Sequence, residues 1–304
     1  AICLQPRASG LLSPALSGWR NFSRRHPFLA VCACVLLPNV VLGLFNFFSN
    51  QRLLLDIYSS PDRIAQQSAL ATAFERTAIV VNAVAFPLGM LFAWMFTRPI
   101  VVAMGLAKGS RSSLSEAIGL FDRSAVRRKT LWLGDAAAWI GVMEWLLAGI
   151  AFPIGIWLQI GSLAPEVPWL FMQSPIACGL VAAAYPFFLS SLLALRVFYP
   201  AQIPLSLGEA GLPQDEEALH SLASRSGFYL LIAGGVPLVT LGLLVILHRS
   251  TDRLSLALLT AAGLSGLLFA SWARQAIHSD SEAIIAAGRP LDQLASESLT
   301  SSRR

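Results

Sequence analysis

Charged side chains are scarce in this sequence. Asp, Glu, Lys and Arg make up 13% of the 304 residues, whereas an ordinary soluble domain contains roughly 25%. Apolar residues make up 55%, and the mean hydropathy is +0.64. These values exclude a typical water-soluble globular domain and indicate a protein that is embedded in a lipid bilayer.

Motifs of soluble enzymes are also missing. The sequence contains no HExxH zinc motif, no GxxxxGK[ST] phosphate loop and no GxSxG nucleophile elbow. Its four histidines, His26, His220, His248 and His278, fall at span ends or in loops. We therefore expect no catalytic residue, metal ligand or cofactor on this chain. We expect no nucleic-acid partner either, because no RNA- or DNA-binding motif is present.

Cysteine is rare and does not form a recognisable redox or zinc motif. The four cysteines are Cys3, Cys32, Cys34 and Cys178. The Cys32-Ala33-Cys34 spacing differs from the CxxC pair that redox and zinc sites use. We interpret these residues as small, buried apolar side chains.

Long apolar runs are abundant instead. A transmembrane helix needs about 20 mostly apolar residues, and six stretches qualify: 27–48, 77–96, 134–158, 171–195, 227–247 and 254–272. The first is too long for a signal peptide, and no small-residue cleavage site follows it. We predict an all-α, polytopic integral membrane protein with six transmembrane helices in one domain, residues 27–272.

Basic residues are distributed unevenly between the loops. Of the 22 lysines and arginines, 17 fall before the first span, after the even-numbered spans or in the tail. Positive charge accumulates on the cytoplasmic side of membranes. This distribution predicts that both termini lie in the cytoplasm.

The segments between the spans carry weaker signals. We expect a flexible basic lead-in over residues 1–26 and a short interfacial helix after Pro61. The loop 97–130 has apolar residues at helical spacing, which favours an amphipathic helix on the membrane surface. In the tail, residues 273–304, we expect the last helix to end near Gly288 and the rest to be disordered.

One carboxylate lies inside the third span. Glu144 is ten residues beyond Gly134, about 15 Å of helix rise and near the middle of the bilayer. A charge there costs at least ~2.5 kcal/mol. Small residues on the same helical face, including Gly141 and Ala148, indicate that Glu144 points at a neighbouring helix.

Polar partners for Glu144 are few. No Lys or Arg lies within a span, and the asparagines Asn39, Asn46 and Asn82 are the best neutral candidates, followed by Ser190 and Ser191. We expect a protonated Glu144 that is hydrogen-bonded to one of the asparagines. Two interpretations stay open: a polar contact that joins helices, or a proton- or ligand-linked group.

Two other features of the spans have structural interpretations. Prolines lie within five spans, at Pro38, Pro87, Pro153, Pro186 and Pro237, and each can kink its helix. Asp135 lies in the first turn of the third span, where a carboxylate suits the helix dipole or pairs with an interfacial cation.

Several short motifs together resemble a known membrane module. The matching residues are Arg127, Arg128 and Leu131 before the third span, Trp145 within it, Arg196 and Pro200 after the fourth, and Arg225, Gly235 and Pro237 at the fifth. The "PNVVLG" segment of the first span, residues 38–43, also matches. This pattern resembles the six-helix N-terminal membrane module of bacterial class III adenylate cyclases, best known from actinobacteria.

The sequence departs from that family in two ways. Gly134 stands near a position where the family often has proline, and neither a relay linker nor a cyclase domain follows the sixth span. The resemblance therefore implies a membrane sensor or regulatory anchor in the bacterial inner membrane, without cyclase activity. It also implies a cytoplasmic signalling partner and favours a homodimer.

Other functions fit the sequence as well. Kinked spans and a protonatable Glu144 are compatible with a proton-coupled secondary transporter or permease. A structural subunit of a larger membrane complex is a further alternative.

Overall fold

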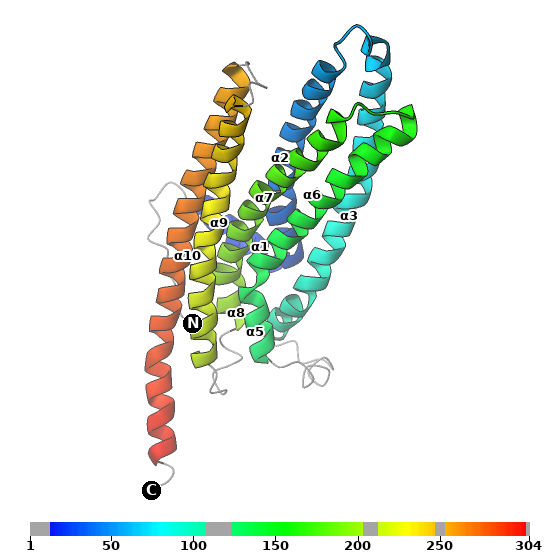
Figure 1. The fold of residues 1–304 in the computed structure, drawn as a ribbon. Coiled ribbons are helices and arrows are strands. Elements are labelled where there is room, and N and C mark those ends of the chain that lie inside the picture. The colour runs from blue at the N-terminus through cyan, green and yellow to red at the C-terminus, as the bar shows by residue number, and fades with distance from the viewer. Residues whose placement is uncertain (1–12, 108–122, 203–211, 247–252, 302–304) are drawn as a thin grey trace.

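The computed structural model describes residues 13–107, 123–202, 212–246 and 253–301. Within these ranges every regular element is a helix, and no strand occurs. Most of the helices are long and run side by side (Figure 1). This confirms the all-α class that the apolar runs predicted.

The helices follow one another with short connections. In chain order they are α1 (Ser13–Arg25), α2 (Pro27–Ile57), the 3-10 turn η1 (Ile64–Gln66), α3 (Gln67–Ala107), α5 (Arg123–Leu131), α6 (Leu133–Ile160), α7 (Glu166–Leu193), the π turn η2 (Ala194–Phe198), α8 (Tyr199–Gln202), α9 (Leu212–Ile246) and α10 (Arg253–Ser301). Pro27 starts α2, where its missing N–H costs nothing. Gly161 ends α6 with φ +75°, a backbone angle that suits glycine.

Five helical segments are long and apolar enough to cross a membrane. Among the residues described they are Pro27–Ile57, Ile64–Met104, Leu133–Ile160, Glu166–Gln202 and Asp215–Thr240. They contain nearly all of the first five predicted spans. The sixth predicted span, 254–272, is helical within α10 but is not one of these five segments.

Three of the expected connecting segments differ from the structure. The lead-in, which we expected to be flexible, contains α1. After Pro61 the chain forms only the 3-10 turn η1, which leads directly into α3, so the short helix expected there is not separate from the second predicted span. α10 continues to Ser301, past the expected end near Gly288. Most of the amphipathic helix expected in the loop 97–130 lies outside the described residues.

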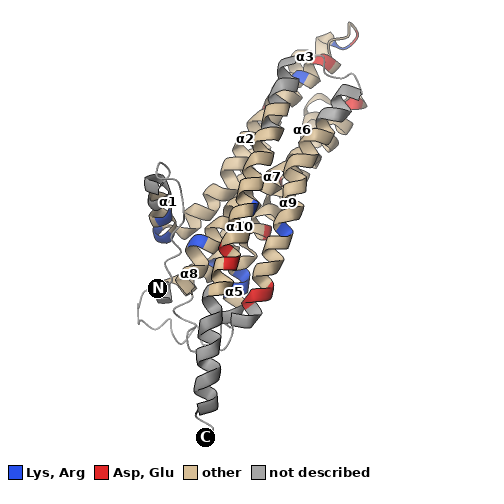
Figure 2. Ribbon diagram, turned by 90° about the vertical axis from the view of Figure 1, so that its left-hand side faces the viewer, with Lys and Arg blue, Asp and Glu red and all other residues tan. Residues whose placement is uncertain are grey.

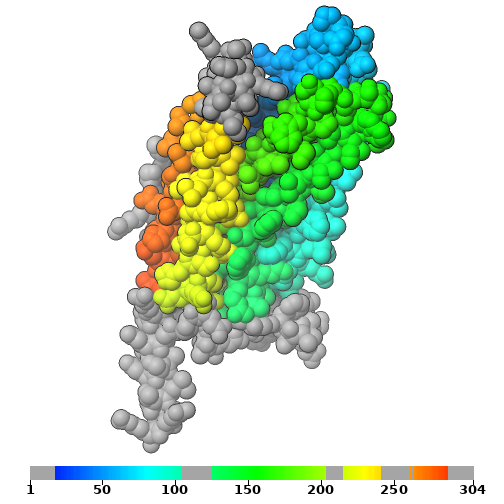
Figure 3. All heavy atoms as spheres, in the orientation of Figure 1, coloured from blue at the N-terminus to red at the C-terminus, as the bar shows by residue number. Residues whose placement is uncertain are grey.

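The helix α7 occupies the centre of the bundle. It contacts α2 and α6 on one side and the α9–α10 pair on the other, as Figure 1 shows. Figure 3 shows α9 and α10 along one flank and α3 along the opposite flank. Buried aromatic residues of α7, including Phe171, Phe187 and Phe188, anchor the apolar clusters on both sides.

Close approach between α6 and α7 depends on Gly179. A Cβ atom at this position would lie 2.7 Å from Cβ of Trp145, closer than two carbon atoms can pack. The indole of Trp145 therefore lies directly against the α7 backbone. Its Nε1 donates a hydrogen bond of 2.7 Å to Oδ1 of Asn39, which joins α6 to α2.

The prolines that we singled out all lie inside continuous helices. Pro38 is in α2, Pro87 in α3, Pro153 in α6, Pro186 in α7 and Pro237 in α9. Each removes one intrahelical hydrogen bond without ending its helix. The helix α7 passes into the π turn η2 eight residues after Pro186.

Charged residues gather toward the two ends of the bundle. Figure 2 shows a group near α5 and α8, another at the tip where α2 turns into α3, and long uncharged stretches between them. We call these the α5 end and the hairpin end. Two features of the molecule have the chemistry of a functional site: a groove between α3 and α6, and a set of ion pairs at the α5 end.

Candidate functional site

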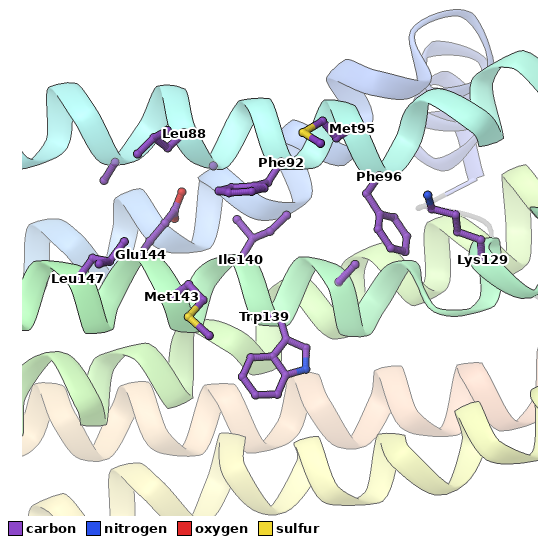
Figure 4. A pocket seen from close by; sticks show the side chains of 13 residues that line it. Leu88, Phe92, Met95, Phe96, Lys129, Trp139, Ile140, Met143, Glu144 and Leu147 are labelled. Atoms are coloured by element: carbon purple, nitrogen blue, oxygen red, sulfur yellow. The ribbon is translucent and has the colours of Figure 1, made fainter.

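The groove lies between α3 and α6 and has a volume of about 460 Å³. Figure 4 shows its long axis running along the two helices, with Leu147 near one end and Lys129 at the other. Its lining is Ala85, Leu88, Gly89, Phe92, Met95 and Phe96 from α3, Lys129 from α5, and Ala136, Trp139, Ile140, Met143, Glu144 and Leu147 from α6. The walls are apolar and aromatic, with two ionisable side chains.

Glu144 points across the groove toward α3. Its carboxyl group lies directly against Gly89, because a Cβ atom at position 89 would overlap Oε1 of Glu144. Any larger residue there would displace the carboxyl group. The prediction that Glu144 points at a neighbouring helix and not away from the bundle agrees with this geometry.

The expected hydrogen bond to an asparagine is not formed. Oε1 of Glu144 is buried without a hydrogen-bond partner among the described residues. Asn39 accepts from Trp145 and donates to the Val35 carbonyl, and Asn82 donates to the carbonyl of Ala78.

Asn46 and the two serines form no hydrogen bond with Glu144 either. Asn46 accepts a hydrogen bond from Ser174 of α7. Ser190 and Ser191 are fully buried in α7, and Ser191 packs against Gly134. The sequence did not reveal these pairings because spacing along a helix fixes depth and face but not which neighbouring helix is adjacent.

Lys129 lies at the end of the groove nearest the α5 end. Its Nζ is 4.7 Å from the centre of the Phe96 ring, a cation–π distance. Within the described parts of the chain it has no carboxylate partner.

The first ion pair of the α5 end is fully buried. Nε of Arg127 in α5 lies 2.8 Å from Oδ2 of Asp215 in α9, and the two side chains are 4% and 1% exposed. The hydroxyl of Tyr199 in α8 donates to the same oxygen at 3.0 Å. Three helices thus meet at one carboxylate.

The second pair connects α6 to α9. Nη1 of Arg225 lies 2.5 Å from Oδ2 of Asp135, and the guanidinium stacks over the Trp132 ring at 3.7 Å. Of the two roles that the sequence allowed for Asp135, the structure supports an ion partner.

The third pair connects the π turn to the long last helix. Nε of Arg196 lies 2.6 Å from Oδ2 of Asp280 in α10. We call the three pairs together the ion-pair belt. Its arginines are all residues that carried the family resemblance, whereas two of its aspartates, Asp215 and Asp280, were missed.

A signal for Asp215 was present in the sequence. Asp215, Leu219 and Leu222 follow helical spacing, and all three are at most 1% exposed. A carboxylate on the apolar face of a helix indicates a buried partner. The predicted spans instead leave residues 215–217 in the connection between 171–195 and 227–247. Asp280 lies among polar residues and offers no comparable signal.

The cysteines do not form a site in the described part of the chain. Cys32 and Cys34 are buried in α2, and Cys178 is partly buried. None of these three is in a disulfide. Cys3 lies outside the described residues. No group of three His, Cys, Asp or Glu side chains that could hold a metal ion occurs within those same residues.

Comparison of the chain with protein-family models, with curated proteins and with solved structures gave no match. The resemblance to the adenylate cyclase membrane module therefore stays a prediction.

Proposed function

We propose that this chain is a membrane sensor or regulatory anchor, which relays a stimulus from the bilayer or the far side to a signalling partner in the cytoplasm. In this proposal both termini are cytoplasmic and the membrane is the bacterial inner membrane. The distribution of the basic residues supports this orientation. The α5 end then faces the cytoplasm.

The observation that carries the proposal is the Arg196–Asp280 pair. α10 has 49 residues, which at 1.5 Å per residue give a length of about 73 Å, more than twice the ~30 Å of a hydrocarbon core. Figure 1 shows it projecting beyond the α5 end. Asp280 is the point at which this projecting helix is held by charge to the π turn η2, which continues the central helix α7.

The other two pairs connect this point to the rest of the bundle. Arg225–Asp135 holds α9, the neighbour of α10, to α6. Arg127–Asp215 holds α9 to α5. A shift of α6 or α7 in the membrane would therefore change the forces on α10, which is what a relay requires.

We expect removal of the Asp280 charge to loosen α10. In a variant whose four native cysteines are changed to alanine, spin labels at Arg98→Cys and Glu282→Cys, which lie on α3 and α10, report the position of α10 by pulsed electron paramagnetic resonance. The distance distribution should broaden in Asp280→Asn, and the exchanged pair Arg196→Asp/Asp280→Arg should restore much of its width. His278→Asn, an exposed change on the same helix, is the control.

An unchanged distribution in Asp280→Asn would contradict the relay, because α10 would then be placed independently of the belt. Recovery by the exchanged pair matters because it separates the loss of the charge pair from general damage to α10. The measurement requires no knowledge of the partner.

A proton-coupled transporter is the second candidate, and Glu144 is the observation that favours it. An ionisable side chain inside a predicted span often marks a proton pathway, and Oε1 of Glu144 is buried without a hydrogen-bond partner among the described residues. Proteoliposomes with trapped pyranine, challenged with amino acids, sugars and carboxylates, test it. A transporter should show solute-dependent acidification that Glu144→Gln abolishes and Glu166→Gln, at the exposed hairpin end, preserves. Under the sensor proposal we expect no such signal.

A further inference from the structure

The groove has the composition of a binding site for flat, apolar molecules. Phe92, Phe96 and Met95 from α3 and Trp139 and Met143 from α6 belong to its lining, and Ile140 lies between the two helices (Figure 4). Aromatic rings stack favourably on other rings, and the methionine thioether contacts ring edges. A simple hydrocarbon chain would not require such a lining.

A single buried acceptor interrupts this lining. Oε1 of Glu144 has no hydrogen-bond donor within the described structure, and Gly89 supplies the space in which the carboxyl group lies. A buried polar atom without a partner costs free energy of about 1–3 kcal/mol. Because Oε1 is enclosed against α3, a ligand hydroxyl in the groove would reach the carboxyl group at its other oxygen, Oε2, which likewise has no hydrogen-bond partner among the described residues.

The groove is accessible from the surface that a bilayer would cover. Phe92 is 56% exposed and Trp139 59%. Gly89 and Phe96 are seven residues apart on α3, which corresponds to roughly 10 Å along the helix. This length of groove accommodates one ring and part of an alkyl chain. A molecule dissolved in the hydrocarbon would therefore enter sideways and leave its tail among the lipids.

We propose that this groove binds a lipid-soluble phenol, whose ring lies against the aromatic side chains of the lining and whose hydroxyl donates a hydrogen bond to Oε2 of Glu144. The proposal is independent of the signalling function, because binding requires only the groove. Within that function, such a molecule would be a stimulus that arrives from the bilayer.

The test compares two ligands that differ in a single hydrogen-bond donor. The full chain is placed in nanodiscs, and tritiated para-octylphenol and its methyl ether, para-octylanisole, are measured by equilibrium dialysis against empty nanodiscs. We expect saturable binding of one phenol per chain. The ether should bind about tenfold more weakly or worse, since one hydrogen bond to a carboxyl group is worth that factor.

Two variants locate the donor's partner. Glu144→Met keeps the side-chain size and removes the acceptor, and should reduce phenol binding to the level of the ether. Gly89→Ala displaces the carboxyl group and should weaken binding of the phenol more than that of the ether. Glu166→Gln, far from the groove, should bind both ligands as the unmodified protein does.

Equal binding of the phenol and the ether would overturn the proposal, because the groove would then take up any apolar molecule. Unsaturable binding, or full-strength phenol binding to Glu144→Met, would overturn it as well. The two-ligand comparison on the unmodified protein decides the question even if a variant fails to fold.

Discussion

Replacing Asp215 by alanine should lower the free energy of unfolding by about 3–5 kcal/mol, the usual cost of removing one partner of a buried ion pair. Arg127 would remain 4% exposed, with its charge uncompensated, and the Tyr199 hydroxyl would lose its acceptor. Unfolding in mixed micelles with increasing SDS, followed by circular dichroism, measures the change.

A matched control lies two residues along the same helix. Glu217 is exposed, and Glu217→Ala should change the free energy of unfolding by less than ~0.5 kcal/mol. The double variant Arg127→Met/Asp215→Leu should be far less damaging than Asp215→Ala. Nη1 of Arg127 and Oδ1 of Asp215 are buried without partners, so removing both charges also removes two unsatisfied atoms.

If Asp215→Ala proved as stable as Glu217→Ala, the ion pair could not be buried as the structure has it. The belt would then be a surface feature worth little. The relay proposal would lose the contact that fixes α9 to α5.

Gly179→Ala should destabilise the bundle by about 1–3 kcal/mol, the cost of overpacking a well-packed core. The added methyl group would lie 2.7 Å from Cβ of Trp145. Because that atom is next to the α6 backbone, relief requires α6 and α7 to separate. The hydrogen bond from Trp145 to Asn39 would be strained as well.

Gly43→Ala provides the comparison, since nothing lies within 4 Å of a Cβ atom at position 43 in α2. With no clash, alanine should stabilise the helix slightly through its higher helix propensity. The two substitutions are chemically identical, so the same SDS titration should show opposite signs. A stabilising Gly179→Ala would show that α6 and α7 are not in close contact.

The sequence predicted the elements well because hydrophobic length determines them. Residues 134–158, for example, form a helix almost where the apolar run indicated, within Leu133–Ile160. The prediction failed where polar segments connect spans. A short interfacial helix was expected after Pro61, yet the chain from Gln67 onward belongs to α3, because helix propensity continues through polar residues such as Gln67 and Glu75.

The candidate site was predicted only in part. The depth of Glu144 in the membrane followed from counting residues along its span. Its neighbour Gly89 was not predicted, because it lies on a different helix. The partner of a polar side chain depends on which helices are adjacent, and six predicted spans allow many arrangements. Asn39 shows this limit, because it faces Trp145, a residue that we had noted only for the family resemblance.

The π turn at Ala194–Phe198 determines the direction in which the side chains of the following helix, α8, point. Each residue of an α-helix turns the chain by roughly 100°, and a π turn holds one residue more than an α turn. Deleting one residue there would restore a regular helix and rotate Tyr199 away from Asp215. The contacts at the α5 end therefore depend on the single extra residue of this turn. We expect that insertions and deletions in this segment are tolerated less well than substitutions.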